Sequence, residues 1–410
     1  MESVFVSVVP HLNSEKGHLQ SYHQSLKNPL EKKGIEHLVY LSKTATFSLP
    51  IGWFPYFHSR GRSPLKYGWN RFLEFSKLFL NKKQSCLYFL ESFGTLDFFA
   101  FSLAAKLFLS KKNRLALLFR YDLPFGRPSG KVQSLLFKCL KRKFKKNLLG
   151  FTDTELLRTW FLQKNIDLRV VPIPIGSSFI NLNFEASSPN SEEFVSQTLG
   201  FSIEENGQRP FTRWKILGKA SKLPENEEVK CKATQRSLEK ICWWPGEPRM
   251  QKGREEIKKL LELKDPSIDF FWLVTSCAVP FPDTPRLLKI KDILTPIEYQ
   301  EQFFRSDIIL LPYDPCIYKR GSSSIFVETV IYGKMPLVKQ GSWLSYELER
   351  FNLFELIINW SCSDFFSHLK QLTENIKVLE KLKQMQEAYK EYHTPSNLVS
   401  KVLSHYSVEI

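Results

Sequence analysis

Two cations stand beside glycine and proline in the segment Trp243–Gly253, WWPGEPRMQKG. Arg249 and Lys252 are three residues apart and precede a predicted helix, so both side chains can reach the same space. A guanidinium provides a planar pair of donors and an ammonium a compact charge, and both suit phosphate oxygens. A surface basic pair in a Pro/Gly turn is the alternative. The position of the pair directly after a predicted strand favours a phosphate site.

A second polar segment, Gly321 followed by Ser322, Ser323 and Ser324, comes after the apolar run DIILLPY and opens an amphipathic helix. Free backbone N–H groups and the positive end of the helix dipole make such a terminus suitable for an anion. An ordinary serine cap explains the same residues. Glu328 follows within about two turns of the helix start. Its carboxylate can accept both hydroxyls of a ribose, or it is a solvated helix residue.

The elements that must position these residues alternate along the chain. Between the start and about residue 180, apolar runs of strand length alternate with helix-like stretches, which predicts a parallel sheet covered by helices on both faces. Ligands of such sheets bind at the carboxyl ends of the strands. The predicted strands are Val4–Val9, His37–Leu41, Cys86–Glu91, Leu115–Phe119, Leu148–Thr152 and Leu168–Pro172, and the helix-like stretches include Gly17–Lys32 and Leu96–Leu109.

The same alternation returns after a segment rich in Ser, Pro, Asn, Glu and Lys. We therefore predict an N-terminal domain over 1–183, a linker with an insertion over 184–239, a second parallel-sheet domain over 240–362 and C-terminal helices over 363–410. The second domain's predicted elements are Ile241–Trp244, a helix from Arg254, Phe270–Thr275, Pro296–Arg305, Asp307–Pro312, a helix from Ser322 and Pro336–Lys339. The final helices are predicted over Phe365–Leu382 and Gln384–Tyr392, with a break at Pro395.

Three motifs in this order resemble the second domain of the group 1 family of retaining GT-B glycosyltransferases. They are Gly-x-Pro-Arg-x-x-Lys-Gly between a strand and a helix, Tyr299 with SDIILLPY, and SSSIFVETVIYGKMPLV, and they cover roughly residues 240–345. The resemblance implies two Rossmann-like domains facing a cleft. It also implies transfer of a sugar, with retention of anomeric configuration, from a nucleotide-diphosphate sugar to a glycan or lipid-linked acceptor.

The resemblance assigns roles to individual residues. It implies that Arg249 and Lys252 bind the donor pyrophosphate, that Glu328 holds the ribose, and that Gly246 and Tyr313 belong to the donor site. Ser322, Ser323 and Ser324 would meet the pyrophosphate at the helix N-terminus.

The chain departs from the family at one place. Arg320 stands eight residues before Glu328, where relatives often carry another glutamate. Arg320 can meet a phosphate or an acidic sugar there, or have a structural role. Fixed cations that neutralise the leaving diphosphate make a metal unnecessary, so we expect a metal-independent enzyme without a cofactor. The catalytic candidates are Arg249, Lys252, Arg320 and His18.

Acceptor-side candidates follow strands of the first domain: Gly17, His18, Glu91 and Arg120. A structural role explains each of them equally well. The segment Lys131–Leu149 reads as a basic amphipathic helix, with Val132, Leu135, Leu136, Cys139, Leu140, Phe144 and Leu148 on its apolar face. It can rest on an anionic membrane or hold a lipid-phosphate acceptor. The alternative is a packed helix with a solvated basic face.

Composition and charge restrict the other possible functions and the location of the protein. The net charge of +16 is compatible with a polyanionic partner, but there is one dense basic stretch and no nucleic-acid motif, so nucleic-acid binding ranks last. The seven cysteines are scattered, and the N-terminus lacks the basic region of a signal peptide, which favours a cytoplasmic protein, soluble or peripheral at a membrane. A catalytically idle nucleotide-sugar-binding protein is the main alternative, because of Arg320.

Overall fold

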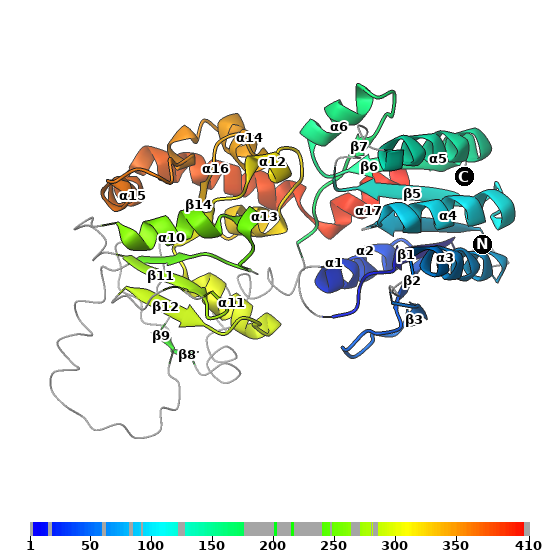
Figure 1. Ribbon diagram of the computed structural model, residues 1–410, viewed down its shortest axis with the longest axis horizontal. Coiled ribbons are helices and arrows are strands. Elements are labelled where there is room, and N and C mark those ends of the chain that lie inside the picture. The colour runs from blue at the N-terminus through cyan, green and yellow to red at the C-terminus, as the bar shows by residue number, and fades with distance from the viewer. Residues whose placement is uncertain are drawn as a thin grey trace, which may run out of the picture. The chain divides into compact units, whose positions relative to one another are not determined.

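The structure is a computed structural model that describes residues 3–14, 19–59, 63–81, 85–91, 93–121, 128–175, 201–202, 215–216, 240–246, 248–263, 271–279, 281 and 286–405 (Figure 1). Residues 1–175 and 240–410 belong to one compact unit that contains two parallel sheets, and residues 176–239 form a second unit. Within the second unit two short strands are described, β8 (Phe201–Ser202) and β9 (Lys215–Ile216), which pair antiparallel. Most of the predicted linker 184–239 lies outside the described residues.

The N-terminal sheet has seven parallel strands in the order β3-β2-β1-β4-β5-β6-β7. All six predicted strands are present, and β3, a strand with Pro55 at its centre, is an edge strand that the sequence pattern did not indicate. Because β1 and β4 are neighbours, the strand order reverses between them. The strands are β1 (Ser3–Val9), β2 (Ile35–Ser42), β3 (Trp53–Phe57), β4 (Cys86–Glu91), β5 (Arg114–Phe119), β6 (Leu148–Thr152) and β7 (Arg169–Val170).

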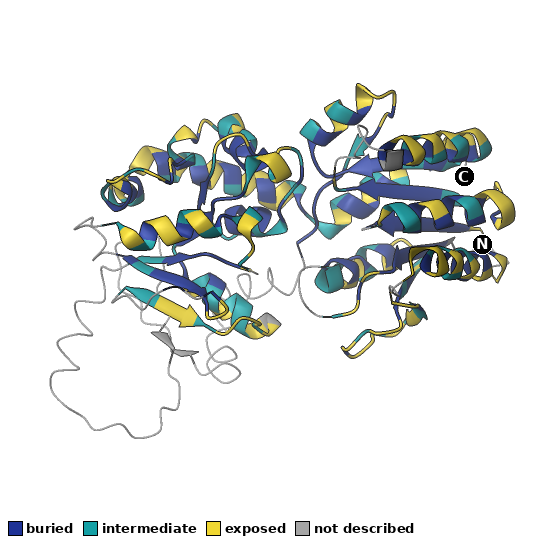
Figure 2. Cartoon of the chain, in the orientation of Figure 1, coloured by how far each residue is buried: buried dark blue, intermediate teal, exposed yellow. Residues whose placement is uncertain are grey.

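Helices cover both faces of this sheet (Figure 1). On one face α3 (Pro64–Leu80), α4 (Thr95–Phe108) and α5 (Pro128–Phe144) bury aromatic and aliphatic side chains against the strands. On the other face lie α1 (Leu19–Ser25), α2 (Lys27–Glu31) and the last helix of the chain, α17 (Pro395–Ser404). Pro395 thus begins a helix, because a proline at the first helical position loses no hydrogen bond. The central strands of the sheets are buried, whereas the edge strands β3 and β12 (Leu287–Ile290) and the outer sides of the helices have exposed residues (Figure 2).

The predicted apolar face of Lys131–Leu149 is confirmed for Leu140 and Phe144, which are buried, but it was wrong elsewhere. Helix α5 ends at Phe144, and Leu148 belongs to β6. Val132 and Leu135 are exposed, whereas Phe137, which was not on the predicted face, is buried. Apolar residues occur at helical spacing on two sides of this helix, and contact with the sheet decides which side is buried. The basic side also has internal roles, since Lys143 Nζ donates to the Ala105 and Leu109 carbonyls at 2.9 and 2.7 Å.

The C-terminal sheet has five parallel strands in the order β12-β11-β10-β13-β14. The strands are β10 (Lys240–Trp243), β11 (Phe271–Ser276), β12 (Leu287–Ile290), β13 (Ile308–Leu311) and β14 (Met335–Val338). The helices are α10 (Arg254–Glu262), α11 (Pro296–Arg305), α12 (Pro315–Tyr318), α13 (Ser324–Ile331), α14 (Trp343–Arg350), α15 (Phe365–Glu374) and α16 (Ile376–Tyr392). The bounds predicted for α11 are confirmed, because Thr295 and Glu298 form a capping box around Pro296.

The boundary predicted between the last two helices of this domain, after Leu382, was wrong. It falls at Asn375, whose side-chain oxygen accepts from the Lys377 and Val378 backbone N–H groups at 3.1 and 3.3 Å and caps α16. Both helices add to the core of the C-terminal sheet, in contrast to α17. Among the described residues, no helix is long and apolar enough to cross a membrane.

Candidate functional site

Two loops meet where the strand order of the C-terminal sheet reverses. The chain runs outward from β10 to β11 and β12, then returns to β13 on the other side of β10. Such a switch point is where open parallel sheets bind ligands. The loops after β10 and β13 are tied together, because the Asp314 N–H donates to the Gln251 carbonyl at 2.9 Å. Gly253 permits this approach with φ +88°, since a Cβ there would lie 2.3 Å from the Pro312 carbonyl oxygen.

Predicted donor residues come together on these loops. Gly246 has φ +84°, and a Cβ at this position would lie 2.8 Å from Lys252 Nζ. That ammonium stands 5.6 Å from the centre of the Tyr313 ring. Burial raises the pKa of Tyr318, and the positive charges of Lys252 and Arg249 oppose the shift, which places both cations near this ring. The arrangement is a cationic loop near one buried and one half-buried tyrosine at the carboxyl ends of the strands.

The three predicted serines have different positions. Ser323 caps α13 by accepting from the Phe326 N–H at 3.3 Å, and Ser324 is the first helical residue. The Ser322 hydroxyl donates to Asp153 Oδ2 at 2.5 Å. Ser322 therefore contacts a carboxylate that follows β6. The N-terminus of α13, which begins two residues later, has the positive dipole end that suits an anion.

Glu328 lies on α13 among apolar residues and is 8% exposed. The Tyr299 hydroxyl donates to its Oε2 at 3.0 Å, and burial raises the pKa of Glu328 to about 7, which this hydrogen bond only partly offsets. The structure thus excludes the solvated helix residue as an account of Glu328. Its carboxylate has Oε1 left to accept a further donor such as a hydroxyl group.

Arg320 lies beside residues of the N-terminal half of the chain. Its guanidinium carbon is 5.5 Å from the ring centre of Trp160, on α6 (Glu155–Leu162), and its carbonyl accepts from the Thr154 hydroxyl at 2.7 Å. The cation is therefore stacked on an indole ring, a position that combines a planar charge with an apolar surface.

Glu91 and Arg120 are brought together, but they bind each other. Arg120 reaches Glu91 Oε2 at 3.1 Å and Asp153 Oδ2 at 3.2 Å, and His23 Nε2 lies 2.7 Å from Glu91 Oε1. Burial alone would raise the pKa of Glu91, yet His23 and Arg120 lower it to about 2. Both side chains are held by internal partners, although Arg120 Nε is buried without a hydrogen-bond partner among the described residues. Their geometry favours the structural alternative over direct contact with an acceptor. Gly17 and His18 lie outside the described residues.

Sequence reasoning missed the rest of this buried network. Ser7 on β1 lies 3.1 Å from His23 Nδ1 and 3.0 Å from His37 Nε2 on β2. Burial lowers the pKa of His37 to about 3, so its ring is neutral. The available signal was a polar residue inside each of two apolar strand runs. The network spans the switch point between β1 and β4.

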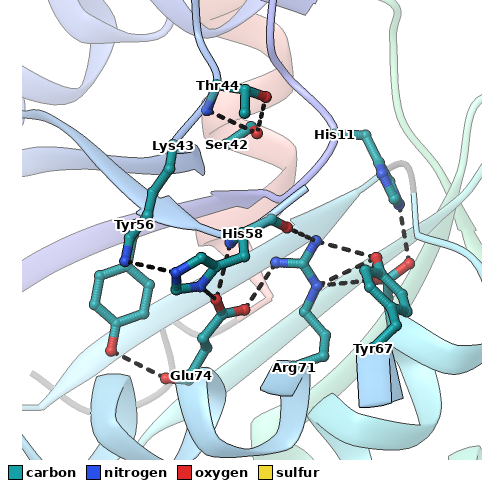
Figure 3. A network of polar contacts seen from close by, with 10 residues as sticks. His11, Ser42, Lys43, Thr44, Tyr56, His58, Tyr67, Arg71 and Glu74 are labelled. Atoms are coloured by element: carbon teal, nitrogen blue, oxygen red, sulfur yellow. Dashed lines mark hydrogen bonds and ion pairs between the residues drawn. The ribbon is translucent and has the colours of Figure 1, made fainter. Parts of the chain in front are cut away.

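A pocket of about 340 Å³ opens beside β3 and the start of α3. Arg71, 1% exposed, forms its floor and donates to Asp97 Oδ1 at 3.0 Å, to Glu74 Oε2 at 2.9 Å and to the His58 carbonyl at 3.0 Å (Figure 3). Glu74 also binds His58 Nδ1 at 2.5 Å. The carboxylates are therefore occupied. The remaining lining residues are Ser59, Ser63, Lys66, Tyr67 and Asn70.

Two lysines lie at or near this pocket. Lys43 Nζ lies 3.2 Å from His58 Nε2, which lines the pocket (Figure 3), and the exposed Lys66 is also a lining residue. Sequence analysis did not single out these residues, because β3 and α3 were not predicted. Over the part of the chain that the structure describes, no group of three or more His, Cys, Asp or Glu side chains is arranged to hold a metal ion.

Comparison with known proteins identifies the fold. No family model and no curated protein matches the sequence. Solved structures match over nearly the whole length: a glycosyltransferase from Rickettsia africae ESF-5 (11% identity, 99% of this chain and 98% of that chain, TM-score 0.62) and sucrose-phosphate synthase from Thermosynechococcus elongatus (10%, 99% and 98%, 0.60). A third is the E. coli trehalose-6-phosphate structure bound with UDP-2-fluoro glucose (11%, 99% and 99%, 0.63).

These similarities define a class of fold. The chain has two parallel-sheet α/β domains that match GT-B glycosyltransferase structures, as the three motifs implied. At identities of 10–11% the match establishes the fold, and the residues of the site must carry the function.

Proposed function

We propose that the protein is a glycosyltransferase that uses a nucleotide-diphosphate sugar as donor. The observation that carries the proposal is the site at the C-terminal switch point, where Lys252 and Arg249 stand near one end and Glu328 is buried on α13. Two cations suit a diphosphate, and a buried carboxylate with a spare acceptor suits ribose hydroxyls. One matching structure holds UDP-2-fluoro glucose, which supports a sugar nucleotide as the class of donor.

In the proposed reaction, the bond between the anomeric carbon and the diphosphate oxygen breaks, and a bond to an acceptor hydroxyl oxygen forms. The leaving diphosphate keeps the electron pair and accepts the proton that the acceptor hydroxyl loses. Arg249, Lys252 and the N-terminus of α13 stabilise the charge that develops on the leaving diphosphate. This role needs no metal ion, and we propose a metal-independent reaction with retention of configuration, as in the group 1 family.

We place the acceptor in the pocket beside α3. It is large enough for a sugar, its carboxylates are bound to Arg71 and His58, and Lys66 stands at its rim. Hydroxyls of Ser59 and Ser63 and the Asn70 amide can bind sugar hydroxyls. This composition favours an acceptor sugar that carries a phosphate or carboxylate, either free or within a glycan or lipid-linked molecule. The six described cysteines are free thiols, which supports a reducing compartment such as the cytoplasm.

Donor binding can be tested by thermal stabilisation with UDP-glucose and a panel of other nucleotide sugars, because a ligand specific for the folded state raises its stability. We expect one nucleotide sugar to raise the melting temperature of the native protein. Arg249→Ala and Glu328→Ala should each need at least about ten times more of that nucleotide sugar for the same stabilisation. Lys258→Ala, an exposed lysine on α10, is the matched control. No stabilisation by any nucleotide sugar would contradict the proposal.

Transfer is tested separately by release of nucleoside diphosphate in the presence of glucose, glucose 6-phosphate or glucuronate. We expect the anionic sugars to be better acceptors, and Lys66→Ala to raise their KM while Lys77→Ala, an exposed lysine of the same helix, leaves it unchanged. Donor binding without hydrolysis or transfer to any acceptor would instead favour the idle sugar-nucleotide-binding protein that the Arg320 departure suggested.

A further inference from the structure

The outer side of three neighbouring helices exposes large apolar residues. Helix α3 packs against α4, and α4 against α5, on one face of the N-terminal sheet. On α3, Leu65 is 87% exposed, Trp69 61% and Leu80 62%; Leu107 on α4 is 58% exposed and Leu135 on α5 60%. Smaller exposed areas come from Leu73, Phe99, Phe108 and Val132. Single exposed apolar residues are ordinary, but a set on adjoining helices indicates an interaction surface.

Aromatic contacts connect α3 to α4 across this side. The rings of Trp69 and Phe72 have centroids 5.4 Å apart, and those of Phe72 and Phe108 are 6.1 Å apart. Leu65, Trp69 and Leu73 are spaced four residues apart, so they form one stripe along α3. These contacts join the exposed apolar residues of α3 to those of α4.

The exposed charges of these three helices have one sign. Helices α3, α4 and α5 contain two acidic residues, Glu74 and Asp97, as the sequence and the described parts of these helices show. Both are buried and bind Arg71, at 2.9 and 3.0 Å. The exposed charged residues of the three helices are all basic: Lys66, Lys77, Lys106, Lys131, Lys138, Lys141 and Arg142. A solvated helix face normally carries both signs.

We propose that this α3–α5 face, defined by the exposed apolar and basic residues of the three helices, rests on an anionic lipid bilayer. Apolar side chains and Trp69 would enter the boundary between headgroups and acyl chains, and the lysines would meet lipid phosphates. Exposed leucines and a tryptophan add nothing to a phosphate-backbone contact, so lipid explains both properties of the surface where a nucleic acid explains one. The surface is wider than the predicted helix Lys131–Leu149 and does not depend on the proposed transfer reaction.

Sedimentation of the full-length protein with vesicles tests the apolar part of the face. We expect binding to vesicles of phosphatidylcholine with phosphatidylglycerol, weak binding to pure phosphatidylcholine, and loss of binding at high salt. The double variant Leu65→Ser/Trp69→Ser should lower partitioning about tenfold, because it removes two inserted side chains. Ile376→Ser, which changes a 70% exposed residue on α16, is the matched control and should bind like the native protein.

The basic part is tested by the triple variant Lys77→Glu/Lys106→Glu/Lys138→Glu, with Lys383→Glu on α16 as control. The triple variant should lose binding to anionic vesicles, with unchanged circular dichroism showing that it folds. No binding of the native protein to anionic vesicles at low salt overturns the proposal, as does binding that neither set of changes weakens. Binding of an RNA oligonucleotide that the triple variant abolishes, without vesicle binding, would assign the face to nucleic acid and overturn it as well.

Discussion

Glu328 and Arg120 are buried charges in opposite electrostatic environments. Glu328 has one described hydrogen-bond donor, the Tyr299 hydroxyl, and burial dominates, so the pKa of its carboxyl rises. Arg120 lies between two carboxylates, those of Glu91 and Asp153. A carboxylate held ready for a ligand is expected to lack full compensation in the free protein, whereas a structural charge is expected to be paired with opposite charges. On this contrast we propose that Glu328 belongs to a ligand site and Arg120 to the framework.

The raised pKa of Glu328 predicts a pH dependence of stability. In the folded protein the Glu328 carboxyl keeps its proton up to about pH 7. In the unfolded chain the same carboxyl has its ordinary pKa of 4.5 and therefore loses the proton at a lower pH. Stability should therefore fall as pH rises from about 4.5 to 7, by at most about 3 kcal/mol. Glu328→Gln removes this loss, so ligand-free variant and native protein should differ little at pH 5, and the variant should melt higher at pH 8. If the melting temperatures of the variant and the native protein changed with pH in the same way over this range, the raised pKa of Glu328 would be contradicted.

Removing Arg120 should be strongly destabilising. Arg120→Leu removes the cation that the buried carboxylates of Glu91 and Asp153 share, which typically costs about 3–5 kcal/mol in the free energy of unfolding measured with urea. Arg158→Leu removes an exposed partner of Glu155, 3.3 Å away, and should change stability by less than about 1 kcal/mol. Adding Glu91→Gln and Asp153→Asn to Arg120→Leu should recover part of the loss. Equal effects of the two single variants would argue against a framework role.

At the scale of elements, two strand-to-helix loops form the candidate donor site. The loop after β10 contains the cations, and the loop after β13 leads to the N-terminus of α13 and Glu328. Their contact depends on Gly253, because only a residue without Cβ leaves room for Pro312 at this distance. The geometry of the site is therefore a property of the pair of loops.

Gly253→Ala should separate the two loops. The added Cβ would lie 2.3 Å from the Pro312 carbonyl oxygen at a φ of +88°, so we expect a stability loss of about 2 kcal/mol or more and weaker stabilisation by the donor. Gly34→Ala is the control: φ is +68° but nothing lies within 4 Å, so only backbone strain of about 1 kcal/mol applies and donor binding should persist. Both are measured by thermal unfolding with and without nucleotide sugar. Unchanged donor binding in Gly253→Ala would refute this role of the loop contact.

At the scale of the whole molecule, the chain returns to its beginning. After α16 has completed the core of the C-terminal sheet, α17 packs against the N-terminal sheet. Leu398, Val399 and Val402 lie in one cluster with Tyr22 and Leu26. The last helix therefore belongs to the core of the first sheet, although about 390 residues separate it in sequence from β1.

Val399→Asp should consequently destabilise the N-terminal sheet. It places an unpaired carboxylate in an apolar cluster, and we expect a loss of about 3 kcal/mol or more. Ser400→Asp introduces the same group one residue away at an exposed position and should have little effect. Hydrogen exchange of β1 and β4 amides, compared between the two variants, would locate the change. If Val399→Asp speeded hydrogen exchange only in the C-terminal sheet, α17 would not be a support of the N-terminal sheet.

The sequence by itself determined the fold class and most strands, and it placed the predicted donor residues in two loops that the structure brings together. This was possible because strand runs such as Ile308–Leu311 are apolar throughout, because the two cations follow a strand closely, and because Glu328 lies in the helix that follows the next loop. Local order of this kind is readable from spacing alone.

Only the tertiary structure decided which polar residues are free and which are bound. Glu91 and Arg120 each follow a strand, as a ligand-binding residue would, but strands distant in sequence bring them together and they neutralise each other. The pocket at Arg71 depends on the edge strand β3 and on Asp97 from another helix, and the buried side of α5 depends on the sheet beneath it. Pairing of charges and choice of buried face are long-range contacts, which the spacing of residues along one segment does not contain.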